Sequence, residues 1–568
     1  MKILLICPES KSSFRFTPKD ARRFWFPRNS IVQLAAMTPP EHEVVCIDEV
    51  VQQTPLDEDF DLVGLSPMTY QAPRAYELSA HFRARGVPVV MGGYHVTGLP
   101  DEAQPHADAL VLGEAEGIWP GLLQDVQQGT LKRRYHQQGF PSLVGLPPPR
   151  RDLIPKNLYF TRFSVETTRG CPHDCSYCDV TSFFGRSFRW RPIPEIVAEL
   201  KQIQETEGKN AWVFICSDNM AGNRRETKAL MQAMIDEGIT LPWGSQCTLN
   251  LANDKELLDL ARRSNCVAMF VGLETISQEN LMQVRKSFNK VGSFIDQIQA
   301  FHDHEIMVNT GMIFGLPEDD EGVFERTLEF LVRTRIELAL FSILVPLPTT
   351  KIFHEMREQI FDFDWSHYDG KHVVFRHKRL SVEALYEGWC WTYRHFYNFR
   401  NIGRRVLPTE RRILARLASN LVHRQMAHRI PRGSLTPLAR IFRGGWERAL
   451  GTHGMELLSA LKVKVGRLGE TAAIQLEGTL DHIALHELWE KVHETATKAR
   501  MSIELNLRDV EIPTEAVQAL GAKVRRTLEK LAAQGRTLTL LHLDEEAALA
   551  LRQLFGYPQA LQIIPRSE

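Results

Sequence analysis

The sequence lacks several features that would place the protein in a special class. It has no run of about 18 apolar residues, so we expect no membrane-spanning helix. The opening Met1–Pro8 is too short for the apolar part of a signal peptide, and we expect none. Lys and Arg number 68 against 69 Asp and Glu, so the overall charge predicts no nucleic-acid partner. With 43% hydrophobic and 24% charged residues in 568, the chain predicts a globular, cytoplasmic protein of three or four folding units.

The cysteines do not form a disulfide framework. Their number, 9, is odd, and three of them, Cys171, Cys175 and Cys178, lie within eight residues. In a chain without an export signal, such a cluster indicates a metal-binding or catalytic site. We interpret the six scattered cysteines as small apolar residues without a functional role.

Residues 1–140 alternate short apolar runs with helical patterns, which predicts a doubly wound, Rossmann-like α/β domain. The strand candidates are Lys2–Cys7, His42–Asp48, Phe60–Ser66, Pro88–Met91 and Ala109–Leu112. The turns Ser66–Tyr70, Gly92–His95 and Gly113–Glu116 would follow three of these strands. Open α/β sheets bind ligands at the carboxyl ends of their strands, so these turns form a candidate binding edge.

A second α/β region follows a Pro-rich linker at residues 141–158. Residues 159–370 contain six strand candidates with longer helical spacers, which predicts a complete or partial (β/α)6 barrel. These candidates are Phe163–Thr167, Ala211–Cys216, Trp243–Thr248, Val267–Leu273, Met307–Phe314 and Leu338–Val345. The cysteine cluster follows the first of them, where a barrel of this kind carries its active site.

The last two regions differ from the first two in composition. Residues 371–455 form a predicted helical, basic segment, and residues 391–450 contain 13 Arg and no Lys, opposed only by Glu410 and Glu447. Either these arginines are solvated or paired with acids of the barrel, or they form a surface for anionic lipid, a phosphate-bearing substrate or an acidic partner.

Residues 456–568 return to an α/β rhythm and contain no cysteine. The strand candidates there are Ala472–Leu476, Ser502–Leu507 and Thr537–His542, and the helix candidates are His486–Lys498 and Glu515–Gln534. We expect a separate interaction domain.

The cysteine spacing C-x3-C-x2-C predicts an iron–sulfur cluster. Four-iron clusters are usually held by four Cys thiolates, so three thiolates would leave one iron open to a substrate or cofactor. A zinc site of Cys171, Cys175, Cys178 and His173 is the alternative. Because His173 lies inside the loop, simultaneous tetrahedral ligation would be strained, which disfavours zinc.

The loop Arg169-Gly170-Cys171-Pro172-His173-Asp174-Cys175-Ser176-Tyr177-Cys178 resembles the CxxxCxxC motif of the radical S-adenosylmethionine (SAM) superfamily. Further landmarks follow in the family's order, including Ser217-Asp218-Asn219 and the GxIxGxxE pattern that begins at Gly311. The resemblance implies that Cys171, Cys175 and Cys178 hold a 4Fe-4S cluster and are catalytic. The SAM contacts that it implies are Tyr177, Ser217, Asp218, Gln246, Glu274, Gly311 and Ile313.

Each of these SAM landmarks has a structural alternative. Asp218 and Asn219 could form an ordinary strand-end turn and helix cap. Glu274 could be a buried carboxylate paired with an Arg, and Gly311 and Gly315 could relieve crowding against a helix.

The resemblance also implies the chemistry. The open iron would bind SAM, and one electron would cleave it to methionine and a 5'-deoxyadenosyl radical that abstracts hydrogen from a small-molecule substrate. A flavodoxin- or ferredoxin-type reductant is the implied partner.

A doubly wound domain before such a barrel resembles the cobalamin-binding class of the superfamily. The contacts that this implies are Ser66, Tyr70, Gly92, Gly93, Tyr94, His95, Gly113 and Glu114. The D-x-H-x-x-G signature that places a His on cobalt is missing, so no lower axial His of that kind is expected. His95 could instead be a hydrogen-bonding loop residue, and the domain could be one that no longer holds cobalamin.

These resemblances together imply a class B radical SAM methyltransferase-like enzyme. It would methylate an unactivated carbon of a small, apolar or specialised-metabolite substrate. The alternative within the class is radical cyclisation, ring rearrangement or oxidation without methyl transfer. A methylthiotransferase would need three further cysteines in the first domain, which has only Cys7 and Cys46. An iron–sulfur regulator or scaffold is the alternative from another class.

The C-terminal region is similar to STAS domains through Leu476–Asp481 and Leu505–Val510. Regulators of that family carry D-S-S-G where this chain has Pro513-Thr514-Glu515-Ala516, so a phosphorylation switch is not implied. We expect docking or dimerisation through this domain, peripheral membrane contact through the basic segment, and no nucleic-acid partner.

Overall fold

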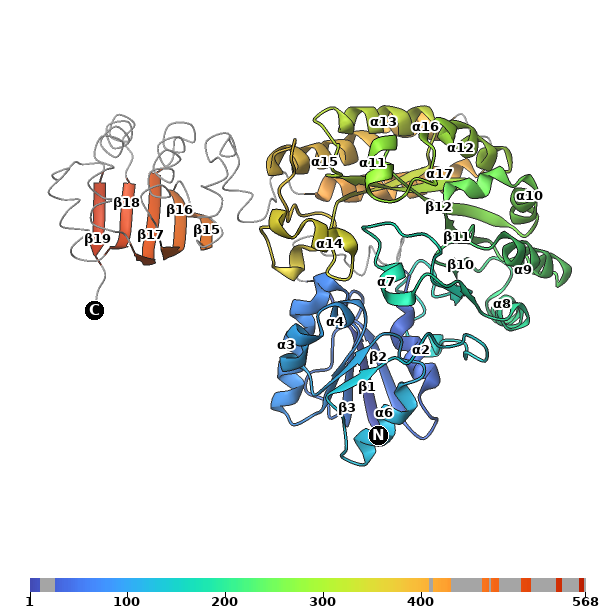
Figure 1. Ribbon diagram of the computed structural model, residues 1–568, viewed down its shortest axis with the longest axis horizontal. Coiled ribbons are helices and arrows are strands. Elements are labelled where there is room, and N and C mark those ends of the chain that lie inside the picture. Colours follow the sequence, from blue (N-terminus) through green and yellow to red (C-terminus); the bar gives the residue numbers. More distant parts are fainter. Residues whose placement is uncertain are drawn as a thin grey trace. The chain divides into compact units, whose positions relative to one another are not determined.

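The structure is a computed structural model that describes residues 1–10, 26–407 and 412–430, and the backbone of five strands between 462 and 565. Residue contacts divide the chain into two compact units. The first is Met1–Leu380 with Ala384–Ser434, and the second is Ser381–Glu383 with Leu435–Glu568. Figure 1 labels the helices and strands of each unit.

The first unit begins with a sheet of six parallel strands in the order β2-β1-β3-β4-β5-β6. Its strands are β1 (Lys2–Cys7), β2 (Glu43–Asp48), β3 (Leu62–Leu65), β4 (Val89–Met91), β5 (Ala109–Leu112) and β6 (Arg134–His136). The five predicted strands are confirmed, two of them to the residue. The sixth was missed because Arg134–His136 is a short, partly exposed edge strand with no apolar run.

Helices cover both faces of this sheet, as expected for a doubly wound fold. They are α2 (Asn29–Met37), α3 (Ala72–Ala84), α4 (Tyr94–Gly98), α5 (Pro100–Ala103) and α6 (Trp119–Gln127). Neighbouring residues of β1 point to opposite faces: Ile3 and Leu5 pack in one buried cluster with α2 and α6, and Leu4 and Ile6 pack in another with α3. Because both faces are buried, every residue of this strand after Lys2 is apolar.

A second sheet of six parallel strands follows, in the order β14-β13-β12-β11-β10-β7. Its strands are β7 (Ser164–Glu166), β10 (Val213–Cys216), β11 (Trp243–Cys247), β12 (Cys266–Glu274), β13 (Met307–Phe314) and β14 (Leu338–Ile343). The main helices between them are α8 (Ile193–Glu207), α9 (Arg224–Asp236), α10 (Lys255–Arg263), α12 (Phe294–Asp303) and α13 (Val323–Arg333). The sheet order starts at β14 and ends at β7, so the six predicted units form a partial barrel.

The two faces of the second sheet differ. Along β13 the residues Val308, Thr310, Met312 and Phe314 are buried, and Phe314 contacts Phe324 of α13 with ring centroids 4.9 Å apart. The alternate residues, among them Asn309 and Ile313, lie on the opposite, concave face and are partly exposed. The concave face is therefore the one that can receive a ligand.

Three helices follow the second sheet: α15 (Val382–Phe396), α16 (Phe399–Val406) and α17 (Ile413–Arg429). Among the described residues of the predicted segment 371–455, residues 382–396, 399–406 and 413–429 are helical, whereas residues 371–381 contain no helix. Arg405 donates to the backbone carbonyls of Ile336 and Glu337 at 2.8 Å, and Arg416 pairs with Glu337 at 2.9 Å. Arg416 is thus paired with an acid of the barrel, as one interpretation expected, whereas Arg405 is buried and donates to backbone carbonyls instead of an acid.

The second unit contains a sheet in the order β15-β16-β17-β18-β19. Its strands are β15 (Lys462–Leu468), β16 (Thr471–Thr479), β17 (Ser502–Glu511), β18 (Leu538–Leu543) and β19 (Leu561–Pro565). The first two strands are antiparallel and the later pairs are parallel. The three predicted strands overlap β16, β17 and β18, whereas the predicted helices His486–Lys498 and Glu515–Gln534 lie outside the described residues.

Among the helices that the structure describes, none is both long enough and apolar enough to cross a membrane.

Candidate functional site

The three clustered cysteines lie in one loop at the carboxyl edge of the second sheet. The loop connects β8 (Thr168–Arg169) to α7 (Val180–Phe184), and β8 pairs with β9 (Arg189–Trp190). All three are free, partly buried thiols. The sequence motif therefore occupies the position expected of it, directly after the first strand of the barrel.

Backbone contacts hold the cysteine loop at three points. The Gly170 N–H donates to Asp218 Oδ2 at 2.7 Å, and the Ser176 N–H donates to the Val284 carbonyl at 3.0 Å. The Ser176 carbonyl accepts from the Ile352 N–H, also at 3.0 Å. Gly170 has φ +91°, and a Cβ there would lie 2.1 Å from the Ser187 carbonyl, so only glycine fits at the start of the loop.

The loop supplies a donor set that fits an iron–sulfur cluster. Burial raises the pKa of the Cys178 thiol to about 12, and it also raises the pKa values of Cys171 and Cys175. Metal binding must therefore displace a proton from each sulfur. In the described part of the chain, no group of three Cys, His, Asp or Glu side chains is arranged so that it could hold a single metal ion. The ring of His173, the fourth ligand of the zinc alternative, stacks on Phe288 at 3.6 Å.

The end of β12 brings an ion pair to the cysteine loop. Glu274 has φ +67°, at a register shift against β13. Lys286 Nζ donates to Glu274 Oε1 at 2.7 Å and to Tyr177 Oη at 3.1 Å. Glu274 is thus paired with a cation, as the structural alternative expected, but the cation is Lys286 and not an Arg. Sequence reasoning missed Lys286 because it lies 12 residues away in an irregular segment.

A row of cross-strand neighbours crosses the concave face below the strand ends. Gln246, Phe270, Asn309 and Leu338 are register partners on β11, β12, β13 and β14. Among the described residues, the buried Asn309 Oδ1 has no hydrogen-bond partner. A buried acceptor without a partner is costly unless a ligand satisfies it. Sequence reasoning missed Asn309, although a polar residue within the apolar strand Met307–Phe314 was a usable signal.

The next row contains two glycines in a closely packed part of the face. Gly272, Gly311 and Leu340 are register partners, and Ile313 follows Gly311 on the same face. A Cβ at Gly311 would come within 3.2 Å of the Phe270 ring on the concave face. Crowding at Gly311 therefore involves a neighbouring strand, whereas a Cβ at Gly315 would meet Leu385 of α15, as the structural alternative expected.

Ser217 and Asp218 meet the cysteine loop at the end of β10. Ser217 Oγ lies 2.7 Å from Thr168 Oγ1, and Asp218 accepts from Gly170. Burial raises the pKa of Asp218 to about 7, against the stabilising Gly170 N–H. The alternative in which Asp218 and Asn219 cap a helix is wrong in position, because the N-cap of the next helix, α9, is Asn223.

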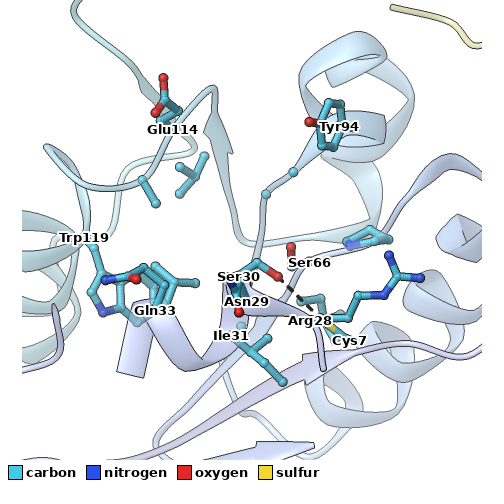
Figure 2. Close-up of a pocket in the computed structure, with 18 of the residues that line it drawn as sticks. Cys7, Arg28, Asn29, Ser30, Ile31, Gln33, Ser66, Tyr94, Glu114 and Trp119 are labelled. Carbon is cyan, nitrogen blue, oxygen red and sulfur yellow. Dashed lines mark hydrogen bonds between the residues drawn. The ribbon is translucent and has the colours of Figure 1, made fainter. Parts of the chain in front are cut away.

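A cavity of about 310 Å³ lies at the carboxyl edge of the first sheet (Figure 2). Six of the eight predicted cobalamin contacts line it: Ser66, Gly92, Gly93, Tyr94, Gly113 and Glu114. Residues that sequence reasoning missed also line it, notably Arg28, Asn29 and Gln33 at the start of α2. Tyr70 is not in the lining, but its hydroxyl accepts from Arg28 at 2.8 Å.

His95 is not brought to the cavity. It is fully buried in α4, where its Nε2 lies 2.9 Å from Tyr76 Oη and 3.5 Å from Glu102 Oε1. Trp365 Nε1 of the barrel donates to the same Glu102 oxygen at 2.8 Å. Among the residues that the structure describes, no histidine lines the cavity. This geometry agrees with His95 as a hydrogen-bonding residue.

The opposite wall of the cavity comes from the barrel. Glu166, Arg169, Phe183 and Phe184 all line it. Tyr94 of the first sheet stacks on Phe183 of α7, with ring centroids 4.3 Å apart. Because α7 begins two residues after Cys178, the cavity and the cysteine loop share a structural wall.

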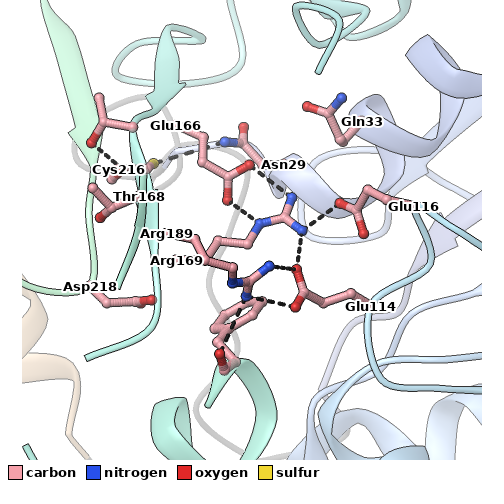
Figure 3. A network of polar contacts seen from close by, with 12 residues as sticks. Asn29, Gln33, Glu114, Glu116, Glu166, Thr168, Arg169, Arg189, Cys216 and Asp218 are labelled. Carbon is pink, nitrogen blue, oxygen red and sulfur yellow. Dashed lines mark hydrogen bonds and ion pairs between the residues drawn. The ribbon is translucent and has the colours of Figure 1, made fainter. Parts of the chain in front are cut away.

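An ion-pair network joins the side of the cavity that the first sheet supplies to the side that the barrel supplies (Figure 3). Arg169 holds Glu166 with two hydrogen bonds, at 2.8 and 2.9 Å, and contacts Glu114 and Glu116 at 2.5 Å each. Arg189 pairs with Glu114 at 2.7 Å. The Glu114 side chain is 0% exposed and that of Arg169 is 8% exposed, so each charge depends on its partners.

Family comparisons cover both halves of the site. Residues 165–331 match the Radical SAM superfamily, and residues 30–123 match the B12 binding domain. Bacteriochlorophyllide d C-12(1)-methyltransferase of Chlorobaculum tepidum is 30% identical over 413 residues, which cover 71% of this chain and 89% of that protein. Hopanoid C-2 methylase of Rhodopseudomonas palustris is 26% identical over 374 residues, which cover 63% of this chain and 70% of that protein.

A solved structure has the same fold. It is that of the radical S-adenosylmethionine methyltransferase TsrM of Kitasatospora setae, with cobalamin and a [4Fe-4S] cluster bound. The TM-score is 0.56 at 14% identity, and the match covers 75% of this chain and 99% of that chain.

Proposed function

The chain belongs to the cobalamin-dependent radical SAM methyltransferases, and we propose that it methylates an unactivated carbon of a small, apolar or specialised-metabolite substrate. The cofactors of this family are a [4Fe-4S] cluster, SAM and cobalamin. Bound together, they supply one-electron cleavage of SAM and a carrier for a methyl group. Family membership sets aside the alternative of a non-catalytic iron–sulfur scaffold.

The shared cavity wall carries this proposal. The cavity at the edge of the first sheet is lined both by Gly92, Gly93 and Tyr94 and by Arg169 and Phe183, which flank the cysteine loop. Methyl transfer from a carrier to a carbon needs the two reacting groups held next to one another. A cavity bounded by both cofactor regions meets that requirement.

Different residues would hold each of the three cofactors. Cys171, Cys175 and Cys178 would hold the cluster in the loop anchored by Asp218 and Ile352. The proposed SAM contacts are Tyr177, Ser217, Asp218, Gln246, Glu274, Gly311 and Ile313, to which we add Asn309 and Lys286. The proposed cobalamin contacts in the cavity are Ser66, Gly92, Gly93, Tyr94, Gly113 and Glu114, with Tyr70 acting through Arg28.

The concave face supports an apolar substrate. Phe270, Met307, Leu338 and Leu340 all lie on it, and Leu340 is 42% exposed. Burial of apolar ligand surface on such side chains contributes roughly 25 cal/mol per Å². The names of the two relatives, which act on a bacteriochlorophyllide and on hopanoids, agree with an apolar or specialised-metabolite substrate.

The test uses the full chain, reconstituted anaerobically with iron, sulfide and cobalamin and supplied with a reductant. SAM with a deuterated methyl group is added, with bacteriochlorophyllide d or a hopanoid as the probe substrate. We expect 5'-deoxyadenosine and a product that gains the labelled methyl group. A product without the label would favour cyclisation, rearrangement or oxidation. An intact cluster that cleaves no SAM would contradict the proposal.

We further propose the domain division 1–140, 141–158, 159–370, 371–455 and 456–568, with a flavodoxin- or ferredoxin-type reductant and a cytoplasmic location. The order and directions of β15–β19 support a STAS-like last domain that docks or dimerises. Light scattering of the full chain, compared with a chain ending at residue 455, tests this. An equal number of subunits in the two proteins would argue against dimerisation through residues 456–568.

A further inference from the structure

The helix α17 has the reverse of the usual amphipathic pattern. Its buried face consists of Arg416, Asn420, His423 and Ala427, which recur at helical spacing. Its outer face carries Leu414 and Leu421, which are 79% and 37% exposed. A helix of a globular protein normally buries its leucines and exposes its polar residues. The apolar outer face of α17 therefore needs an explanation.

The neighbouring helix α16 extends this outer face. Arg405 of α16 donates to Asn420 Oδ1 at 2.9 Å, and the Arg424 guanidinium lies 4.0 Å from the centre of the Phe399 ring. These two contacts show that the helices run antiparallel, side by side. Phe399 and Leu407, at the two ends of the exposed side of α16, are 66% and 67% exposed. We call the outer surface of the two helices the α16–α17 face.

The charge on this face has one sign. Arg400 and Arg404 lie on the exposed side of α16, and Arg412 and Arg429 are exposed at the two ends of α17. Neither helix contains an Asp or a Glu. Within the described residues, Arg400 and Arg404 form no ion pair. Exposed large apolar side chains are thus interspersed with cationic groups, and among the described residues neither Arg400 nor Arg404 has an acidic partner.

We propose that the α16–α17 face docks on an anionic phospholipid bilayer. A bilayer surface takes up both features, because Phe and Leu side chains enter the headgroup boundary while arginines contact anionic headgroups. A free phosphate ligand would use the arginines but leave the four apolar side chains in water. The positive charge of Arg400 and Arg404, on helices that contain no Asp or Glu, is complementary to an anionic membrane.

This surface is separate from the proposed catalytic machinery. None of its residues lines the cavity, and the cysteine loop lies elsewhere in the chain. Membrane docking can therefore be measured without substrate, and its failure would not bear on SAM cleavage. Docking would bring the enzyme to substrates that partition into lipid.

The test is sedimentation of the reconstituted full chain with vesicles. Vesicles of phosphatidylcholine alone are compared with vesicles of phosphatidylcholine and phosphatidylglycerol, at low and high salt. We expect binding only to the anionic vesicles, weakened by salt because exposed charges are screened. Equal binding to both vesicle types, or none to either, would overturn the proposal.

Two double variants locate the surface. Arg400→Ala with Arg404→Ala should weaken vesicle binding about 10- to 30-fold, since each arginine near a membrane contributes about 1 kcal/mol. Leu414→Ser with Leu421→Ser should weaken it by a similar factor at any salt concentration, because the apolar contact is not screened. Arg225→Ala and Val144→Ser change exposed residues elsewhere and should leave binding unchanged.

Thermal unfolding and light scattering without lipid complete the test. The exposed substitutions should leave the melting temperature and the number of subunits unchanged. A leucine variant that changes the number of subunits without lipid would identify a second copy of the chain as the occupant of the face. Equal vesicle binding by the variants and their controls would likewise refute the assignment.

Discussion

The two parallel sheets of the first unit follow the same topological rule but build their sites differently. Each has six strands, and each carries its site at the carboxyl edge. At the first sheet the backbone shapes the cavity, with Gly93 and Gly113 at φ +94° and +91°. At the second sheet the proposed site is built from side chains, namely three thiols, the Glu274–Lys286 pair and Asn309 Oδ1, which has no hydrogen-bond partner among the described residues.

This difference matches what each cofactor requires. A large, flat ligand needs a wall without protruding side chains, whereas a cluster and a small polar ligand need specific donor atoms. Adding a methyl group should therefore damage the first edge, and removing a donor should damage the second. The Arg169 network joins the two edges, so breaking it should affect both.

The largest effect is expected at the second edge. Cys175→Ala removes one of three thiolates from the loop, and we expect loss of both the cluster and SAM cleavage. Iron and sulfide content and the yield of 5'-deoxyadenosine measure this. Cys266→Ala removes a buried thiol of β12 outside the loop and should keep the iron content of the parent. Retained SAM cleavage in Cys175→Ala would refute the ligand assignment.

The next effect is expected at the junction. Arg169→Met leaves the fully buried Glu114 with one cationic partner in place of two, and Glu166 and Glu116 lose their Arg169 contacts. Breaking a buried ion pair from one side costs about 3–5 kcal/mol, so we expect a lower unfolding midpoint and loss of cobalamin on gel filtration.

The control for Arg169 is an exposed pair. Arg150→Met breaks the Arg150–Asp152 contact, whose side chains are about half exposed, and should cost at most about 1 kcal/mol. Denaturant titration compares the two variants. Equal midpoints would show that the Arg169 network contributes no more than an exposed ion pair.

A moderate effect is expected at the first edge. Gly113→Ala places a Cβ 2.2 Å from Gln137 Oε1 in a left-handed backbone, which costs roughly 1–2 kcal/mol, so cobalamin affinity should fall about tenfold. Corrin absorbance retained after gel filtration measures it. Gly117→Ala adds the same methyl group four residues later, where nothing lies within 4 Å. If both variants retain equal cobalamin, the backbone does not shape this site.

The smallest effect is expected from a single acceptor on the concave face. Asn309→Ala removes the unpartnered Oδ1, and one buried hydrogen bond contributes about 0.5–1.5 kcal/mol, so SAM should bind roughly 2- to 10-fold more weakly. Calorimetric titration of the reconstituted protein with SAM measures the change. Met307→Ala, on the same strand face, serves as the control. An unchanged SAM affinity in Asn309→Ala would remove Asn309 from the site.

Much of the fold could be predicted because its signals are local. The strands β1, β5 and β13 match their predicted ranges to the residue, since buried parallel strands are apolar runs ended by turn residues. Arg134–His136 has no such run and gains its place only by pairing with β5. In the same way, the sequence pattern of α17 would place its leucines on the inner face. Its polar residues face inward because they contact Glu337 and Arg405.

The residues of the candidate site likewise fall into those with a local sequence signal and those brought together only by tertiary packing. The cysteine loop, the glycine turns and Asp218 were predicted, because each is a short motif at the end of a strand. Lys286, Asn309 and the partners of Arg169 were not. Arg169 meets Glu114 across 55 residues, and no periodicity or spacing connects two such positions. His95 lies in a predicted turn, but its ring turns to Tyr76 and away from the cavity.

The sequence by itself determined the two parallel sheets, the order of their strands along the chain and the position of the thiols after the first barrel strand. Those features depend on residue type and on spacing over a few positions. Only the tertiary structure decided that the cavity and the cysteine loop share a wall, with Arg169 paired to Glu114. Buried charges take their partners from whichever side chains the packing brings within a few ångströms, and that proximity is not written in local sequence.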